Sequence, residues 1–312
     1  MQSTAKAKKA LLCHSALCCV AVIALLSFAA ATENGATVFP VGVETVMTGV
    51  LPHPRKTMFY EYTCFYEANE IDGSKGQKEP GEFKLRVFAT ALKLSHTWDF
   101  KVFGGNFNTY IAVPVIYQEL HVPPGKHTKY TIGNIDIVPF GVNYHKGIAH
   151  WYYEANVFMP GVGYSKTDFL NVGQHNLAIA PVFGFTLLPN EGKNEISSRI
   201  TYILNGYDKD THYHSGNEFF SEFNVDQMIA KKIALGINGA FYQQTTDDRK
   251  LGAIMGDGFR GRDLQIGPQV RFNLPHGGFA FKYYRDTLVQ NKPRGNAFWF
   301  QIAVPFAALS KH

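Results

Sequence analysis

Between residue 57 and Phe306 the chain consists of about a dozen segments in which apolar and polar residues alternate. In the segment from Leu264 to Leu274, the apolar side chains share one face, and glutamine, arginine and asparagine share the other. Such a period of two is typical of a β-strand that separates an apolar environment from a polar one. The run from Ile132 to Tyr144 changes phase near Ile137, which predicts a β-bulge.

Short and long connectors follow one another between these segments. The short ones are 97–101, 146–147, 189–193, 231–232 and 275–277, and the long ones are 72–81, 121–129, 161–173, 207–216, 245–261 and 288–295. Short periplasmic turns, long external loops and an even number of antiparallel strands are typical of bacterial outer-membrane barrels. We therefore predict an all-β fold, a transmembrane antiparallel up-and-down β-barrel of about 12 strands, with both the N- and C-termini in the periplasm.

The N-terminus indicates the compartment. Three lysines precede an apolar stretch from Ala10 to Phe28, and small residues follow it, so residues 1–31 are predicted to be a signal peptide. An uncleaved membrane anchor is the alternative, because the stretch is long for a signal peptide. Beyond it, no window of about 20 apolar residues predicts a transmembrane helix. A barrel over residues 57–306, with a C-terminal tail at 307–312, is the structure that can then cross the bacterial cell outer membrane.

Charge and cysteine content limit the partners. Without the signal peptide, 27 Lys and Arg face 25 Asp and Glu, which argues against a nucleic-acid binder. Cleavage also leaves Cys64 as the one cysteine, so we expect no disulfide within the chain. The expected partners are outer-membrane lipid and lipopolysaccharide, the barrel-assembly machinery and a small hydrophobic solute, and no cofactor is expected.

Residues 32–56 contain two proline regions and show no strand alternation. This segment is either a loose periplasmic extension or a hatch folded into the barrel lumen. In the second case Val38, Phe39, Val41 and Met47 would occlude the channel.

The polar faces of the predicted strands carry charged residues that we expect to line the lumen. They would form an ion-pair network that fills the interior, or a lining that selects what passes. These residues are Glu61, Arg86, Asp136, Glu154, Arg199, Glu222, Asp226, Arg271 and Lys282.

Aromatic residues occur on the same inward faces. They are either packing filler or contacts for an apolar or aromatic ligand. The candidates are Tyr152, Phe158, Phe220, Tyr242, Tyr284 and Trp299.

Catalytic and metal motifs are scarce. The sequence has no Gly-x-Ser-x-Gly, no His-Glu-x-x-His and no pair of CxxC motifs. Ser215 and Ser221 lie near His212 and His214, an arrangement that invites comparison with outer-membrane acyl hydrolases. Two histidines without a third ligand are a poor metal site. We expect no catalytic residue, no metal and no enzyme activity, with a barrel lipid hydrolase as a minor alternative.

Several motifs resemble the meta-pathway phenol-degradation family of outer-membrane proteins. They are the stretch Tyr213–Phe219, the stretch Gly236–Asp248 with its Gln-Thr-Thr-Asp, the Gly-Pro-Gln-Val that begins at Gly267, and Gly295 with Asn296. The similarity covers most of the mature chain, although Gly133-Asn134 stands where family members tend to have Gly-Asp. The resemblance implies an outer-membrane barrel that is linked to the catabolism of aromatic compounds and admits hydrophobic molecules.

Together these features predict an outer-membrane channel for passive uptake of small hydrophobic compounds, with aromatic compounds as a candidate class. The loops at 161–173 and 245–261 would form its external entrance. A structural barrel with a filled, non-conducting lumen is the main alternative.

Overall fold

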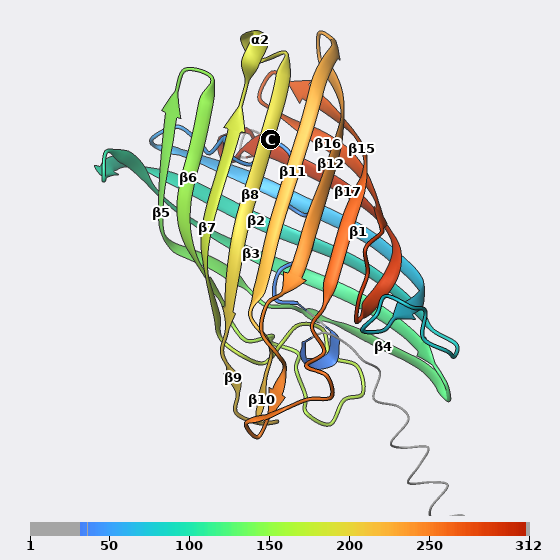
Figure 1. Cartoon of the computed structure of the whole chain (residues 1–312). Helices are drawn as coiled ribbons and strands as arrows, with labels where there is room; N and C mark the ends of the chain where they lie inside the picture. Colours follow the sequence, from blue (N-terminus) through green and yellow to red (C-terminus); the bar gives the residue numbers. More distant parts are fainter. Residues whose placement is uncertain (1–31, 36, 310–312) are drawn as a thin grey trace, which may run out of the picture.

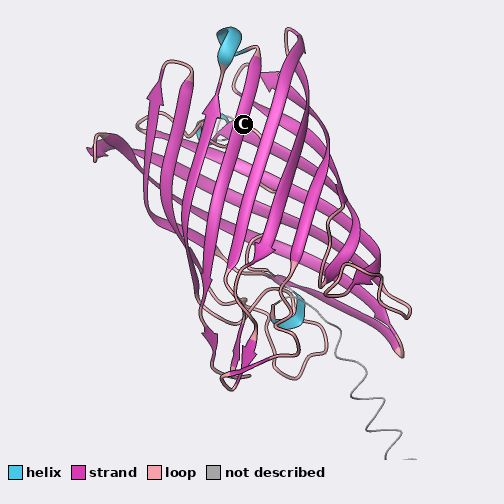
Figure 2. Cartoon of the chain, in the orientation of Figure 1, coloured by secondary structure: helices cyan, strands magenta, loops and turns pink. Residues whose placement is uncertain are grey.

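The computed structural model describes residues 32–35 and 37–309, which fold into a tall barrel of tilted strands (Figure 1). Nearly all of the regular structure is β-strand (Figure 2). The strands of the wall are β1 Lys56–Asp72, β2 Lys84–Val102, β3 Gly105–Val122, β4 Gly125–Ile132, β5 Asp136–Lys146, β6 Ala149–Phe158, β7 Ala178–Leu187, β8 Asn194–Asn205, β11 Glu218–Ala230, β12 Ile233–Gln244, β15 Arg262–Leu274, β16 Gly277–Asp286 and β17 Lys292–Pro305. None of the helices within the described residues is long and apolar enough to cross a membrane.

The wall is an antiparallel meander that closes where β1 pairs with β17. β4 and β5 pair with successive parts of β3, so together they form one interrupted strand. Counted in this way, the barrel has twelve strands, and the predicted fold class is confirmed. The β5–β6 register shifts between Ile137 and Phe140, so the predicted bulge near Ile137 is also confirmed.

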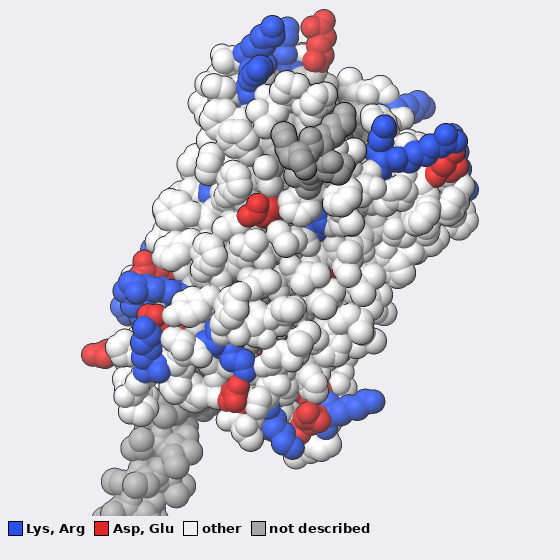
Figure 3. All heavy atoms as spheres, turned by 180° about the vertical axis from the view of Figure 1, so that it is seen from behind, with Lys and Arg blue, Asp and Glu red and all other residues white. Residues whose placement is uncertain are grey.

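The alternation in sequence becomes an inside and an outside of the barrel. On β15 the polar Gln265, Gln269 and Arg271 are buried, whereas Ile266 on the opposite face is exposed. Aromatic side chains pack side by side on the outer surface of β16 and β17, as Phe281 and Phe300 do with ring centroids 5.2 Å apart. Seen from behind, charged side chains gather at the two ends, and the band between them carries few (Figure 3). The outer surface therefore matches a hydrocarbon layer bounded by water on both sides.

The two ends of the barrel differ. At one end the connections are short, at 103–104, 147–148, 188–193, 231–232 and 275–276. The third of them contains the helix-like turn α2 Pro189–Gly192. At the other end the loops are long, and a small sheet joins two of them through β9 Tyr207–Asp208, β10 Tyr213–His214, β13 Arg249–Lys250 and β14 Ala253–Ile254. We refer to these as the short-turn end and the long-loop end.

Two of the predicted connectors are wrong. The expected long loop at 121–129 is a tight turn, because Val122 and Gly125 pair directly and only Pro123 and Pro124 lie between them. The expected turn at 97–101 is strand, because β2 and β3 continue past a register shift to the turn at Phe103 and Gly104. The sequence did not reveal the first hairpin because prolines occupy its tip. It did not reveal the second because the strand changes phase before the turn.

The two ends of the described chain lie at opposite ends of the barrel, so the expectation that both termini are on the short-turn side is wrong. The 3₁₀ turn η1 Glu33–Gly35 lies among the long loops, where the amide of Glu33 donates to Ser215 Oγ at 3.1 Å. The last helix, α3 Phe306–Leu309, follows β17 at the short-turn end. The predicted signal peptide, residues 1–31, lies outside the described residues.

Candidate functional site

The lumen is occupied by the chain that precedes β1. From η1 at the long-loop end this N-terminal segment, residues 37–55, runs through the barrel to the short-turn end, where the amide of Arg55 donates to Thr97 O at 2.8 Å. Val38, Phe39 and Val43 are buried in one apolar cluster with side chains of the wall. The site is therefore built from two parts, the inner wall and the N-terminal segment.

Phe39 anchors the segment in the half of the barrel nearer the long loops. Its ring meets Phe158 and Phe220 edge to face, with centroids 6.2 Å and 5.8 Å away. The guanidinium carbon of Arg199 lies 4.4 Å from the centroid of the same ring. This arrangement combines aromatic packing with a cation–π contact in a desolvated setting, where both are strongest.

Glu44 forms the charged centre of the lumen. Lys93 Nζ lies 2.6 Å from Glu44 Oε1, and Arg199 Nε lies 3.5 Å from Glu44 Oε2. Arg199 also faces Glu222 at 3.4 Å, and the amide of Glu44 donates to Glu222 Oε1 at 3.0 Å. Two cations and two carboxylates thus neutralise one another, which makes their burial tolerable.

Lys282 and Tyr284 hold the backbone of the segment beside this centre. Lys282 Nζ donates to the carbonyls of Gly42 and Val43 at 2.9 Å and 2.8 Å, and Tyr284 Oη donates to Gly42 O at 3.2 Å. Gly42 has φ +81°, and a Cβ there would lie 3.0 Å from the Tyr284 ring. Glycine is therefore required for the segment to approach the wall this closely.

A second charged group lies nearer the short-turn end. Arg271 pairs with Asp226 at 2.9 Å and with Glu195 at 3.3 Å. Glu195 Oε1 in turn accepts a hydrogen bond from the amide of Met47 at 2.6 Å. The wall thus binds the backbone of the segment as well as its side chains.

Asp136 and Glu154 are buried in a different sector. Asp136 accepts hydrogen bonds from Tyr110 Oη at 2.6 Å and from Asn156, and Glu154 accepts one from Asn108 at 2.7 Å. These acids are bound by neutral donors instead of cations.

The structure places seven of the nine predicted lumen charges inside the barrel and corrects the other two. Arg86 is exposed on the outer face of β2, where it pairs with Glu67 at 3.1 Å and Glu119 at 3.7 Å. Glu61 shares the outer face of β1 with Thr63, which donates to it at 2.8 Å. β1 has polar or aromatic residues on both faces, so alternation alone did not distinguish them.

Sequence reasoning missed Lys93 and Glu44. On β2, Ala89, Ala91 and Lys93 alternate with the exposed Phe88 and Leu92. The period-two rule applied to this strand places Lys93 inward. No periodicity marks Glu44, because the N-terminal segment is irregular.

All six predicted inward aromatics are buried within the barrel. All six belong to the apolar cluster that also contains Phe39. They are Tyr152, Phe158, Phe220, Tyr242, Tyr284 and Trp299.

Several cavities border the N-terminal segment. One lies at the short-turn end beside Pro305 and Phe306, and two lie farther along the segment. Of these two, the first has a volume of about 260 Å³ and lies between Val38 and Val41 of the segment and the inner faces of β1, β2 and β3. The second, of about 180 Å³, lies between residues 46–51 and the wall toward the short-turn end. Tyr62 borders both cavities. The first cavity is lined mainly by aliphatic and aromatic side chains, including Leu85 and Trp299.

The residues compared with a hydrolase dyad are held by other partners. Ser215 accepts the amide of Glu33, and His214 Nε2 bonds to Asn205 O at 2.9 Å. Asp248 holds these loops together by accepting hydrogen bonds from the amide of Gly216 and from Tyr213 Oη, both at 2.7 Å. Burial raises the pKa of the Asp248 carboxyl, and these two hydrogen bonds partly offset that increase.

The sequence matches the family described as "Putative MetA-pathway of phenol degradation" over residues 68–302. The chain belongs to this family. The match covers most of the barrel and includes the motifs that suggested the resemblance. No curated protein matches the sequence significantly.

Among solved structures, the fold is similar to the COG4313 outer membrane channel from Pseudomonas putida F1. The TM-score is 0.71 at 14% sequence identity, covering 86% of this chain and all of the other. The similarity is much lower to a FadL homologue from Pseudomonas aeruginosa, with a TM-score of 0.40 at 10% identity over 90% of this chain and 96% of the other. It is equally low to the CymD monoaromatic hydrocarbon channel, with a TM-score of 0.41 at 7% identity over 90% and 98%. This family member is an outer-membrane β-barrel.

Proposed function

We propose that this barrel is a channel for passive uptake of small hydrophobic solutes, including compounds with one aromatic ring. The observation that carries the proposal is the cavity of about 260 Å³ between the N-terminal segment and β1–β3. An apolar cavity of about 150 Å³ is enough to hold benzene. The family description, which refers to phenol degradation, agrees with this class of solute.

The N-terminal segment is the hatch of this channel. Ion pairs and hydrogen bonds attach it to several strands, so the barrel lacks the wide aqueous lumen of a porin. An apolar solute has a different route, because it can leave water for the aliphatic and aromatic surface beside the hatch. The solute would pass from the first cavity to the second at Tyr62.

The long loops form the external side and the short turns the periplasmic side, as in other outer-membrane barrels. The loops at 161–173 and 245–261 then lie at the entrance. Lipopolysaccharide and lipid surround the barrel, and assembly depends on the usual insertion machinery. In this view the protein transports its solute and does not transform it.

Uptake in intact cells tests the proposal. Cells with a lipopolysaccharide outer leaflet should take up labelled toluene several-fold faster when they express the protein, while entry of a trisaccharide stays unchanged.

The ion pairs around Glu44 favour a second candidate, a structural barrel with a permanently filled lumen. Correctly inserted protein with no gain in toluene entry would support that alternative.

A further inference from the structure

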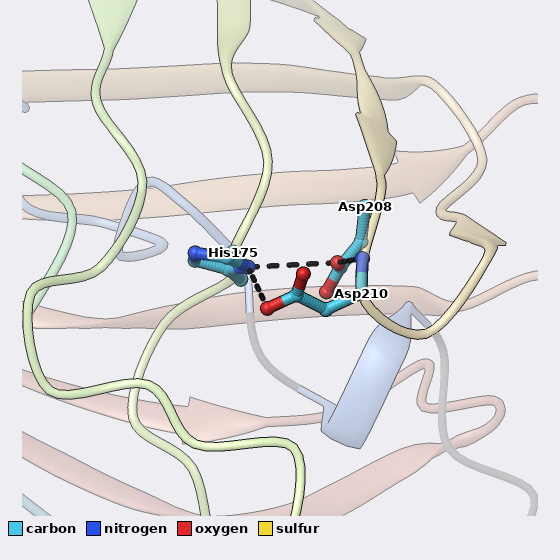
Figure 4. Close-up of side chains that lie close together, drawn as sticks. All are labelled: His175, Asp208 and Asp210. Atoms are coloured by element: carbon cyan, nitrogen blue, oxygen red, sulfur yellow. Dashed lines mark hydrogen bonds and ion pairs between the residues drawn. The ribbon is translucent and has the colours of Figure 1, made fainter.

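Three side chains from two long loops converge at the end of the barrel, away from the lumen. His175 lies in the loop between β6 and β7, Asp208 ends β9, and Asp210 follows in the next turn. His175 Nδ1 lies 3.5 Å from Asp208 Oδ1 and 3.7 Å from Asp210 Oδ2. The three groups point toward one another, and their ligand atoms all lie within 4.8 Å of each other (Figure 4).

These separations are too long for hydrogen bonds and fit the spacing of atoms around an ion. A hydrogen bond between a nitrogen and an oxygen spans about 2.7–3.2 Å. Two ligands that each lie about 2.1 Å from a tetrahedral metal ion are about 3.4 Å apart. The distances from His175 to the two carboxylates are close to the second value.

Asp208 is buried with part of its hydrogen-bonding capacity unused. Its side chain is 2% exposed, and Oδ1 accepts hydrogen bonds from the amides of Asp210 and Thr211 at 2.7 Å and 3.4 Å. Oδ2 is buried and has no partner at normal hydrogen-bond geometry among the described residues, and the same is true of His175 Nδ1. Glu33 and Tyr164 lie close enough to the Asp208 carboxyl to interact with it. A buried carboxylate oxygen without a donor is costly, and a cation would compensate it.

The surroundings orient the histidine and supply another acid. The Tyr164 ring stacks on the His175 ring, with centroids 4.6 Å apart and an interplanar angle of 4°. Tyr164 Oη also donates to Glu33 Oε1 at 3.4 Å. Glu33, in η1, is close enough to Asp208 to interact with it electrostatically, so a third carboxylate is within reach. Aromatic packing and hydrogen bonding of this kind hold metal ligands in position.

We propose that His175, Asp208 and Asp210 form a binding site for a divalent transition-metal ion, with Zn²⁺ as the best match. One imidazole nitrogen with carboxylate oxygens is a ligand set that suits Zn²⁺, whereas Ca²⁺ and Mg²⁺ prefer oxygen alone. The ion would join the β6–β7 loop to the β8–β11 loop beside the start of the N-terminal segment. It would therefore hold these two external loops together next to the start of the N-terminal segment.

Direct binding to the folded mature protein tests this site. Tag-free, chelator-treated protein in detergent should bind one Zn²⁺ per chain in calorimetry, with a dissociation constant in the micromolar range or below. His175→Ala and Asp208→Asn should each weaken binding at least 100-fold. His212 lies in the same β8–β11 loop as Asp208 and Asp210 but outside the cluster. His212→Ala should therefore change Zn²⁺ affinity less than twofold.

Asp210→Asn should fold even if the other two variants do not, because the Asp210 side chain is 52% exposed. Retained heat-modifiable migration in gels reports the folded barrel, and this variant should weaken binding at least tenfold. The proposal is overturned if the folded wild type binds no Zn²⁺ at millimolar concentration, or if His175→Ala and Asp210→Asn bind it unchanged. Tighter binding of Ca²⁺ than of Zn²⁺ would overturn the assignment of the ion.

Discussion

Lys93 Nζ on β2 lies 2.6 Å from Glu44 Oε1 in the N-terminal segment, and both side chains are only 10% exposed. This ion pair connects a residue of the barrel wall with one that precedes the first strand by a dozen positions. Since Arg199 and Glu222 complete the group, the segment contributes one of two carboxylates that balance two buried cations. The position of the N-terminal segment and the charge balance of this four-residue group therefore depend on each other.

Glu44→Gln should release the hatch. The substitution leaves Lys93 and Arg199 facing a single carboxylate, and loss of one partner of a buried pair costs about 3–5 kcal/mol. We expect a larger single-channel conductance in planar bilayers and faster proteolysis within residues 37–55. The matched control is Asp99→Asn, whose pair with Arg55 is exposed at the short-turn end. Equal conductance in wild type and Glu44→Gln would show that this ion pair does not hold the segment.

Phe39→Ala should open the half of the lumen nearer the long loops. It removes the contacts with Phe158, Phe220 and Arg199, and truncation of a buried phenylalanine costs about 3–5 kcal/mol. Liposomes carrying the variant should swell several-fold faster in small sugars. The control is Phe281→Ala on the outer face, which should swell at the wild-type rate. Identical swelling of both variants would argue against an occluding role for Phe39.

Bulky substitution at Gly258 should alter uptake without impairing assembly. Gly258 has φ +94°, and a Cβ there would lie 2.2 Å from Asp247 Oδ1, which itself accepts a bond from Arg260 at 2.7 Å. Gly258→Val should therefore displace the 245–261 loop and change labelled toluene uptake at least twofold. Gly252→Val is the control, because Gly252 has a similar φ of +82° but no atom near the added Cβ. Unchanged flux in Gly258→Val would remove this loop from the entrance. Gly256→Val offers a second test, since its Cβ would lie 2.7 Å from the Phe259 ring.

Phe281→Arg should destabilise the barrel in lipid. Phe281 is 49% exposed on the outer face of β16, where hydrocarbon replaces water. Arginine near the midplane of a bilayer costs a barrel about 2–4 kcal/mol. Urea-induced unfolding in vesicles should show this loss of free energy of unfolding, and Leu251→Arg in a long loop should not. Equal stability of the two variants would mean that this face does not meet lipid.

The fold could be predicted from the sequence because every strand of a barrel wall must present one face to lipid and the other to the lumen. β8 and β15 each place mainly polar residues inside and mainly apolar residues outside, and the period-two pattern runs through both strands. The prediction was wrong for Arg86 because β2 has 19 residues, whereas a strand needs about 9–11 to cross a membrane. Its outer end extends past the apolar band, where a charged side chain can face water.

The candidate site was less predictable, because the residues that fill it lack periodicity or come together only in three dimensions. Glu44 lies in an irregular segment, and its partners on β2 and β8 are fixed by barrel closure. His175 and Asp208 belong to loops separated by two strands, so no local spacing marks them. The proline regions and the missing alternation of residues 32–56 allowed a lumen hatch as one alternative, but nothing in the sequence decided between a hatch and a loose extension.

The most direct test of the central claim is the rate of labelled toluene entry into intact cells that express Tyr62→Trp. Tyr62 borders both cavities, so a larger ring there should narrow the apolar route and return entry to the rate of cells without the protein. Phe298→Trp, on the outer face of β17, should keep the full rate of the wild type. Wild-type uptake by folded Tyr62→Trp would contradict passage of the solute through the interior of the barrel.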